Sequence, residues 1–269
     1  MATVQTPRIT HSLKDRKAHS TLWRQSVVVG AILLLWQFGS GTVLNSYYLS
    51  TPAAVVRQIG AWVADGSLWP NLAATLMTTA AGFAAAAIVA IPLALLISGS
   101  RFLDDVFSPF IFAAYSMPKI ILAPALILWL GIGRAPAIVL SAVTAFFLVF
   151  FNLYLGLKTI PGIYADTAAL MDASPLDTAF KFRLPAAAPY LAVGLSQGII
   201  YAFHGTVVGE MTASNTGIGY LIIFAGSKMD STGVMAGICI VAILAVSMIY
   251  ALARTQRFFN SDRGDFDVG

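Results

Sequence analysis

Long apolar runs constrain this chain more than any other feature of its sequence. Six runs cover about residues 26–44, 72–99, 107–131, 135–157, 187–212 and 234–253. A helix of roughly 20 mostly apolar residues crosses a hydrocarbon core of about 30 Å and satisfies its own backbone hydrogen bonds in lipid. Each run is long enough for this, so the sequence predicts an all-α integral membrane protein with six transmembrane helices.

The composition excludes several classes of protein. Of the 269 residues, 58% are hydrophobic and 10% are charged, whereas soluble domains average about 25% charged residues, so a water-soluble globule is excluded. The net charge of +4 comes from basic residues that flank the apolar runs, and a nucleic-acid partner is not expected. The single cysteine, Cys239, allows neither a disulfide nor a thiolate metal site within one chain.

The placement of lysine and arginine predicts the orientation in the membrane. Alternation of the six runs puts most basic residues on one side, namely Arg8, Lys14, Arg16, Lys17, Arg24, Arg101, Lys158, Lys181, Arg183, Arg254, Arg257 and Arg263. The opposite side receives only Arg57, Arg134 and Lys228. Cytoplasmic loops carry the excess of basic residues, so both termini are expected in the cytoplasm. Residues 1–25 would form a cytoplasmic arm, 26–44 a retained anchor, 45–258 the core and 259–269 a cytoplasmic tail.

The segment that joins the first two runs is expected to form a surface helix. One apolar face of that helix would consist of Ala54, Val55, Ile59, Trp62 and Val63, which recur at helical spacing. A helix with such a face would lie along the membrane. The second run is rich in alanine, which predicts close packing against neighbouring helices.

The longest loop on the predicted cytoplasmic side, about residues 158–186, is expected to contain two short helices. Ser174 is placed to cap the second helix, with Pro175 at its first position and Asp177 three residues after the cap. The same helix would carry an apolar face formed by Leu176, Ala179 and Phe180. Two interpretations stay open, because the face could pack under the membrane helices or be exposed and bind a partner.

This loop resembles the ATPase-coupling loop of ABC importer permeases. The family pattern is E-A-A, three residues, G, nine residues, I, any residue and L-P, and its spacing is intact here. The pattern and the capped helix together give the residues expected to contact an ATPase: Asp166, Thr167, Ala168, Asp172, Ala173, Ser174, Pro175, Leu176, Phe180, Leu184 and Pro185. Phe182 occupies the isoleucine position and Asp172 the glycine position. Aspartate tolerates turn conformations better than most other residues.

The resemblance extends over about residues 50–258 and is closest to the nitrate, sulfonate and taurine branch of these permeases. It is carried by LSTPAAV before the second run, MPKIILAPALILWLGIG in the third and VVGEMTASNTGIGYLI at the end of the fifth. It implies the type I ABC importer permease fold in the inner membrane. The transporter would contain two permeases, two ATPase subunits and an external binding protein, and it would import a small anionic solute.

Other polypeptides would supply the ATP site. The sequence contains no G-x-x-x-x-G-K-[ST] phosphate loop, so ATP is expected on the partner subunits, and neither enzyme activity nor a cofactor is expected for this chain. An ATP-independent channel or secondary transporter is the alternative, and the spacing of the coupling loop argues against it. A membrane-embedded enzyme is disfavoured because the histidines are scattered along the sequence, at His11, His19 and His204.

Polar and helix-breaking residues inside the runs are candidates for a passage. Pro118 and Pro124 each remove a backbone hydrogen bond from the third run, which indicates either a packing kink or a position that lines a cavity. Lys119 would lie about 18 Å along that helix at 1.5 Å per residue, near the middle of the bilayer, where a cation needs compensation. His204 and Glu210 would lie in the outer half of the fifth run.

Two explanations of the lysine stay open. In the first, Lys119 pairs with Glu210 or extends its side chain to the membrane surface. In the second, Lys119 and His204 line a mildly cationic passage. Gly217 and Gly219 follow Glu210 in the sequence and indicate either a simple turn or an outer gate.

Overall fold

The computed structural model describes residues 10–40, 42 and 48–261, and the elements in this part of the chain are helices. In chain order they are α1 (Thr10–Gly39), α2 (Pro52–Ala64), α3 (Leu68–Gly99), α4 (Arg101–Ser116), η1 (Lys119–Leu122), α5 (Ala123–Leu130), α6 (Arg134–Thr159), α7 (Ile163–Leu170), α8 (Pro175–Asp177), η2 (Thr178–Arg183), α9 (Leu184–Ala186), α10 (Ala188–Ala213), α11 (Ile218–Ser227) and α12 (Ser231–Ser261). The all-α prediction is confirmed.

Several helices are long and apolar enough to cross a membrane. Among the described residues these are α3, α6, α10 taken together with α11, and α12, while α4 with the η1–α5 segment forms a bent pair that would make a fifth span. Within the described part of α1, the apolar stretch is Val27–Gly39. It is shorter than the roughly 20 residues that a full span needs. The multi-pass architecture is confirmed, and a sixth span over 26–44 stays a prediction that lies partly outside the described residues.

The predicted terminal segments are partly helical. α1 begins at Thr10, inside the predicted arm, and α12 ends at Ser261, inside the predicted tail. The remaining parts of the arm and the tail, residues 1–9 and 262–269, lie outside the described residues.

The prediction of one continuous helix over 107–131 is wrong. α4 ends at Ser116, Met117 and Pro118 are extended (ψ 137° and 113°), and the chain turns by 90° before it continues as η1 and α5. A proline disfavours the helical conformation of the residue before it, so Pro118 ends the helix at Met117 instead of kinking it. The depth expected for Lys119 assumed an unbroken helix and no longer applies.

A bundle of α3, α6 and α10 forms the centre of the molecule, and small residues bring its helices close together. A methyl group added to Gly205 of α10 would lie 2.8 Å from Cα of Ser141 in α6, and one added to Gly209 would lie 2.6 Å from Cα of Ala137. Gly205 and Gly209 are four residues apart, which is the small-xxx-small pattern of close helix pairs in membranes. The close packing predicted for the second run is present in α3, where Ala90 and Ala94 are fully buried.

The predicted surface helix is present as α2, but part of its apolar face is covered by protein. Val55 is buried, and Ile59 and Trp62 pack against a cluster that includes Leu68 and Ile218. These contacts join α2 to α3 and α11. Three of the five residues expected to face the membrane surface therefore pack in the fold.

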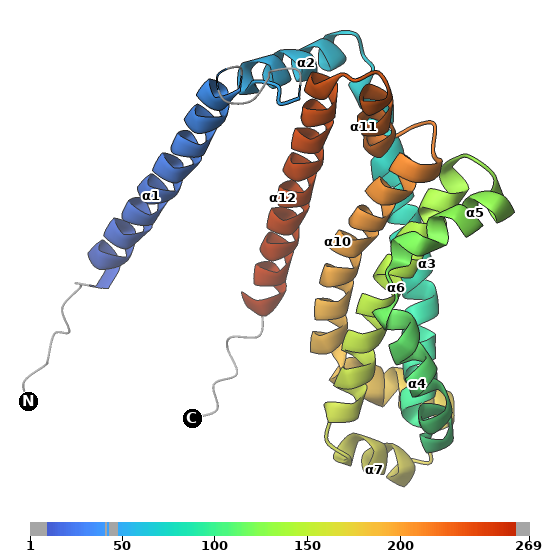
Figure 1. Ribbon diagram of the computed structural model, residues 1–269. Coiled ribbons are helices and arrows are strands. Elements are labelled where there is room, and N and C mark those ends of the chain that lie inside the picture. The colour runs from blue at the N-terminus through green and yellow to red at the C-terminus, as the bar shows by residue number, and fades with distance from the viewer. Residues whose placement is uncertain (1–9, 41, 43–47, 262–269) are drawn as a thin grey trace, which may run out of the picture.

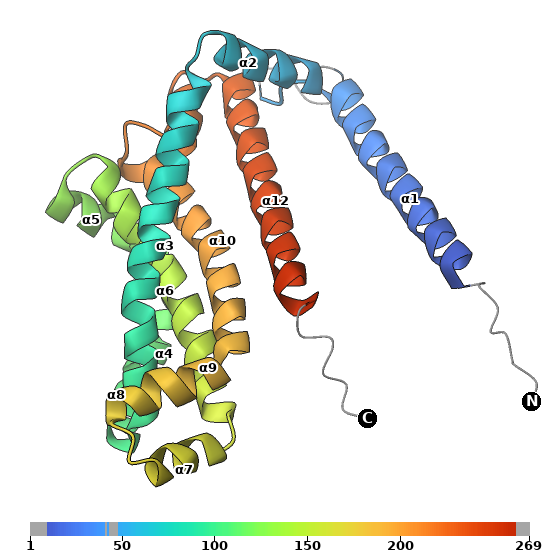
Figure 2. The same ribbon diagram turned by 180° about the vertical axis from the view of Figure 1, so that it is seen from behind.

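The bundle has two ends that carry different elements. Figures 1 and 2 show α2 across one end, named here the α2 end, and α7, α8 and α9 at the other, named the loop end. α1 stands apart from the bundle and is joined to the rest at the α2 end, where Trp36 Nε1 donates to the Ser50 carbonyl at 2.7 Å and the Ser50 and Thr232 hydroxyls lie 2.8 Å apart. From the α2 end, both α1 and α12 extend in the direction of the loop end, so α1 begins and α12 ends on that side of the molecule.

Candidate functional site

The loop end contains the two short helical segments that the sequence predicts. α7 is the first, and α8, η2 and α9 follow one another without a break as the second, which is named here the coupling segment. Ser174 is its N-cap (ψ 159°), and the Ser174 hydroxyl accepts from the Asp177 amide at 3.1 Å and donates to Asp177 Oδ2 at 2.8 Å. Pro175 occupies the first helical position. The predicted cap is confirmed.

The cap also carries a charge pair. Lys181 Nζ lies 2.6 Å from Asp177 Oδ1, one helical turn away. The Lys181 ammonium, and after it the Ser174 hydroxyl, lower the pKa of the Asp177 carboxyl below its ordinary value. The carboxylate therefore stays ionised at neutral pH, and a negative charge in the first turn is favourable there because the amide groups at a helix N-terminus are positive.

Asp172 shows why the family pattern has glycine at its position. Its φ is +51°, in the left-handed region. The Asp172 amide donates to the Ala169 carbonyl at 3.2 Å, and the Ala173 amide donates to the Ala168 carbonyl at 3.0 Å. These two bonds form a Schellman motif at the end of α7, whose central residue is usually glycine. Aspartate fills that role in this chain, so the turn forms here without glycine.

The apolar face of the coupling segment is divided between protein and solvent. Ala179 and Leu184 pack against the core cluster that includes Val149 and Phe150, whereas Leu176 and Phe180 are 72% and 51% exposed. The packing interpretation therefore holds for Ala179, whereas Leu176 and Phe180 are exposed, and the binding of a partner to them stays a prediction.

The end of α7 adds apolar surface that the sequence analysis missed. Leu170 and Met171 are 87% and 68% exposed. They directly precede the left-handed turn at Asp172, and an exposed apolar pair before such a turn was the available signal.

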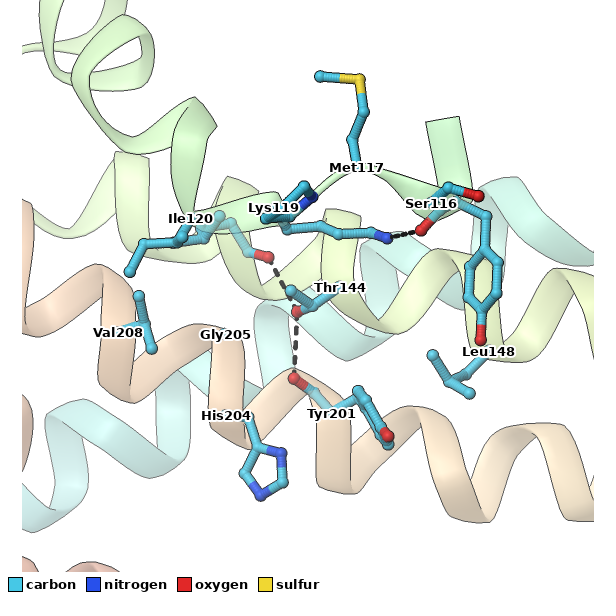
Figure 3. A pocket seen from close by; sticks show the side chains of 13 residues that line it. Ser116, Met117, Lys119, Ile120, Thr144, Leu148, Tyr201, His204, Gly205 and Val208 are labelled. Carbon is cyan, nitrogen blue, oxygen red and sulfur yellow. Dashed lines mark hydrogen bonds between the residues drawn. The ribbon is translucent and has the colours of Figure 1, made fainter. Parts of the chain in front are cut away.

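A second feature is a cavity of about 580 Å³ where η1 meets α6 and α10 (Figure 3). It is lined by Tyr115, Ser116, Met117, Pro118, Lys119, Ile120, Leu140, Thr144, Leu148, Tyr201, His204, Gly205 and Val208. Three of the residues predicted for a passage, Pro118, Lys119 and His204, thus meet in one place. Pro124 is outside this lining, at the start of α5.

The polar groups of the cavity are spread over an aromatic and aliphatic wall. Lys119 Nζ donates to the Tyr115 carbonyl and lies 4.8 Å from the ring centroids of both Tyr115 and Phe147. A cation above ring faces is favoured by their negative quadrupole. The His204 ring centroid lies 5.5 Å from that of Tyr201, and the Thr144 hydroxyl lies 3.1 Å from the Tyr201 carbonyl.

Glu210 has other surroundings and does not pair with Lys119. Its side chain is buried (2% exposed), and Oε2 accepts from the Thr75 hydroxyl at 2.9 Å and from the Gly219 amide at 3.0 Å. Oε1 is buried without a hydrogen-bond partner among the described residues. The structure gives Lys119 and Glu210 separate partners, so the predicted pairing of the two is wrong.

The surroundings of Glu210 form a cap for α11 that is supplied by other helices. The amides of Gly217, Ile218 and Gly219 are consecutive, and they donate to Asn71 Oδ1 at 2.8 Å, Thr75 Oγ1 at 2.9 Å and Glu210 Oε2 at 3.0 Å. The first amides of a helix lack partners within that helix, and α3 and α10 provide them here. The acceptors Asn71, Thr75 and Glu210 are named here the α11 cap.

Gly217 and Gly219 are needed for this cap. Gly217 has φ +109°, and a Cβ added there would lie 2.1 Å from Cδ of Glu210. A Cβ at Gly219 would lie 2.4 Å from the Val207 carbonyl oxygen. Both glycines therefore allow a close turn against α10. A turn was one of the two interpretations that the sequence left open, beside an outer gate. Asn71 and Thr75 were missed, although a polar pair four residues apart on an apolar helix was visible in the sequence.

The sequence also matches a known family over the part of the chain that contains these features. The profile of the family described as "Binding-protein-dependent transport system inner membrane component" matches residues 88–261. This chain belongs to that family. The match contains the coupling segment, the cavity, α11 and the end of α3, so most of the features of this permease described above lie in the region that defines the family.

Individual relatives agree with this assignment. The permease is 32% identical over 232 residues to a probable ABC transporter permease protein of Haemophilus influenzae, covering 86% of this chain and 94% of the relative. It is 27% identical to a putative aliphatic sulfonates transport permease of Bacillus subtilis, covering 82% and 81%. Taurine and nitrate permeases are further relatives, and so are riboflavin and formylaminopyrimidine permeases.

A solved structure supports the fold. The MetNI methionine ABC transporter in an inward-facing conformation matches with a TM-score of 0.59 and 23% identity, covering 73% of this chain and 95% of the compared chain. The fold of the permease is therefore that of a type I ABC importer permease. The sequence relatives confirm the predicted similarity to the nitrate, sulfonate and taurine branch.

Proposed function

We propose that this permease imports a small anionic solute as the membrane subunit of an ATP-driven transporter. An external binding protein delivers the solute, and separate ATPase subunits bind the coupling segments and hydrolyse ATP. The proposal rests first on the exposed apolar residues of the coupling segment, Leu176 and Phe180. It keeps both termini and the loop end in the cytoplasm, in agreement with the distribution of basic residues.

The coupling segment is shaped for a partner rather than for lipid. Leu176 and Phe180 are exposed, and each is followed directly in the segment by a charged residue, Asp177 and Lys181. An apolar patch rimmed by charges is typical of protein interfaces. The Ser174 cap and the Schellman turn at Asp172 fix the segment before a partner binds, so little ordering entropy is lost on docking.

The cavity favours an anion as the solute. Lys119 has a carbonyl and two rings as neighbours and no carboxylate partner among the described residues. A cation in a membrane protein is retained where something compensates it, and a passing anion does so without binding too tightly to leave. The names of the sulfonate, taurine and nitrate relatives agree with this class of solute.

A second copy of the permease completes the passage. The cavity is lined by the end of α4, the turn after it, η1, α6 and α10, and a single bundle has too few helices to enclose a passage. α1 stands apart from the bundle (Figure 2), and its residues Leu34, Leu35 and Phe38 are exposed. Two-fold pairing is the commonest arrangement of soluble oligomers, and a homodimer of the permease would close the cavity from the open side.

The test is co-purification of the permease with its ATPase from membranes. The double variant Leu176→Asp with Phe180→Asp should lose the ATPase while the permease still inserts into the membrane, because only exposed apolar contacts are replaced by charges. Val56→Asp is the matched control, since Val56 is 68% exposed on α2 at the opposite end, and it should keep the ATPase. An ATPase that stays bound to the double variant, or one that never binds the unmodified permease, would contradict the proposal.

A further inference from the structure

Arg183 links the coupling segment to the end of α3. It is the last residue of η2, and its Nη2 lies 3.1 Å from the Ser98 carbonyl oxygen and 3.3 Å from the Ser98 hydroxyl oxygen. The side chain is part-buried, and burial lowers the pKa of the guanidinium below its ordinary value. An arginine remains charged at any physiological pH even so. The contact is therefore a charge-assisted hydrogen bond between two parts of the chain 85 residues apart.

The acceptor of this bond belongs to the last turn of α3. α3 ends at Gly99, and the last carbonyls of a helix lack partners within it. A positive charge beside these carbonyls is favourable because of the helix dipole. Gly99 leaves room for the guanidinium, since a Cβ at that position would lie 3.1 Å from Arg183 Nη1. Arg183 thus caps the end of α3 from the coupling segment.

Besides this bond, Ala179 and Leu184 of the coupling segment pack against the core cluster that includes Leu95 and Ile97 of α3. A cavity of about 720 Å³ lies between the loop end of α3 and the coupling segment, and it is lined by Leu95, Leu96 and Gly99 on one side and by Pro175, Leu176 and Phe180 on the other, with Arg183 among the lining residues. A region with a cavity has fewer packing contacts to transmit a displacement. The bond from Arg183 to Ser98 lies beside this cavity, because Arg183 and Gly99, the neighbour of Ser98, both line it.

α3 carries this contact to the opposite end of the molecule. Its 32 residues reach about 48 Å at 1.5 Å per residue. Asn71 and Thr75, near the start of α3, belong to the α11 cap. α3 is therefore held to the coupling segment at one end and to α11 at the other.

We propose that Arg183 is a positioning residue for transport, which makes α3 follow the coupling segment when an ATPase moves that segment. This inference rests on the proposed function. α3 then displaces α11 through the α11 cap, so that events at the loop end alter the α2 end. Arginine suits this position better than lysine, because its planar group reaches the carbonyl and the hydroxyl of Ser98 together.

The experiment measures coupling in proteoliposomes that contain the permease, its ATPase and its binding protein. Arg183→Met removes the charge and the donors and keeps a stem that packs against the apolar wall. We expect it to retain the ATPase and to hydrolyse ATP, while the solute transported per ATP falls about tenfold. Arg101→Met is the matched control, because Arg101 is an exposed arginine at the start of α4 and lies outside the coupling segment, and its ratio should stay within about twofold of the unmodified permease.

Each result of this experiment has a defined meaning. An unchanged ratio for Arg183→Met would overturn the inference, and so would loss of ATPase binding together with transport, because the residue would then only shape the docking surface. If Arg183→Met does not insert, Gly99→Ala crowds the guanidinium without removing it, and an unchanged ratio in that variant overturns the inference as well. Failure of the unmodified permease to bind any ATPase would instead refute the proposed function.

Discussion

Two charged residues within the helical core, Glu210 and Lys119, have opposite surroundings. Glu210 is buried and accepts hydrogen bonds from Thr75 and from the start of α11. Lys119 lines an open cavity, where its ammonium group contacts a carbonyl and two aromatic rings and no carboxylate of the described residues. The sequence allowed the two to compensate each other, and the structure keeps them in separate sites.

This difference teaches that a charge within a membrane protein has a role that depends on what surrounds it. A carboxylate that completes the end of a helix holds two elements together, because its removal would leave buried amides without acceptors. A cation that lines a cavity and has no carboxylate partner can still attract an anionic solute. We therefore propose that Glu210 stabilises the fold and that Lys119 serves transport, and three predictions test that division.

The largest effect is expected from Glu210→Ala. This change leaves the buried Gly219 amide without its acceptor and the Thr75 hydroxyl with only the Asn71 carbonyl, at 3.2 Å, so the free energy of unfolding should fall by about 3 kcal/mol. Glu210→Gln keeps one acceptor oxygen and should cost about 1 kcal/mol. Thermal unfolding in detergent gives both values. Equal melting temperatures for Glu210→Ala and the unmodified permease would show that the cap is not structural.

A smaller effect is expected from Lys119→Met, and it should concern transport alone. Uptake of an anionic solute should slow about tenfold, which corresponds to about 1.4 kcal/mol, while the melting temperature stays unchanged. Lys228→Met is the control, because Lys228 also lies over a ring, 4.0 Å from the Phe224 centroid, but outside the lining of the cavity. Destabilisation by Lys119→Met without slower uptake would place the lysine with Glu210 as a structural charge.

The smallest effect is expected from combining the two sites. If Lys119 and Glu210 act separately, the stability changes of Lys119→Met and Glu210→Gln should add to within about 0.5 kcal/mol in the double variant. Unfolding of the two single variants and the double variant measures this coupling. Recovery of both stability and uptake in the double variant would mean that the residues compensate each other after all, and the separation of the two sites would be wrong.

Much of the local structure could be predicted from the sequence, because it depends on neighbouring residues. Long apolar runs predicted the helices α3, α6, α10 and α12, and the pattern S-P-L-D predicted the cap at Ser174. The family spacing placed the turn at Asp172, whose left-handed φ needs only local hydrogen bonds. These features depend on contacts within one or two turns, so the order of residues determines them.

The rest depends on contacts between distant parts of the chain. Thr75 and Glu210 are 135 residues apart, and Arg183 and Ser98 are 85 residues apart, so only the packing of α3, α10 and the coupling segment brings them together. Proline at 118 indicated a disturbed helix, but the 90° turn also depends on how η1 packs beside α6. The sequence by itself determined a multi-pass helical membrane protein and the capped helix at Ser174, because periodicity and capping are local, and its family motifs indicated a permease. Tertiary structure decided which charges meet, because helix packing sets distances that no local pattern contains.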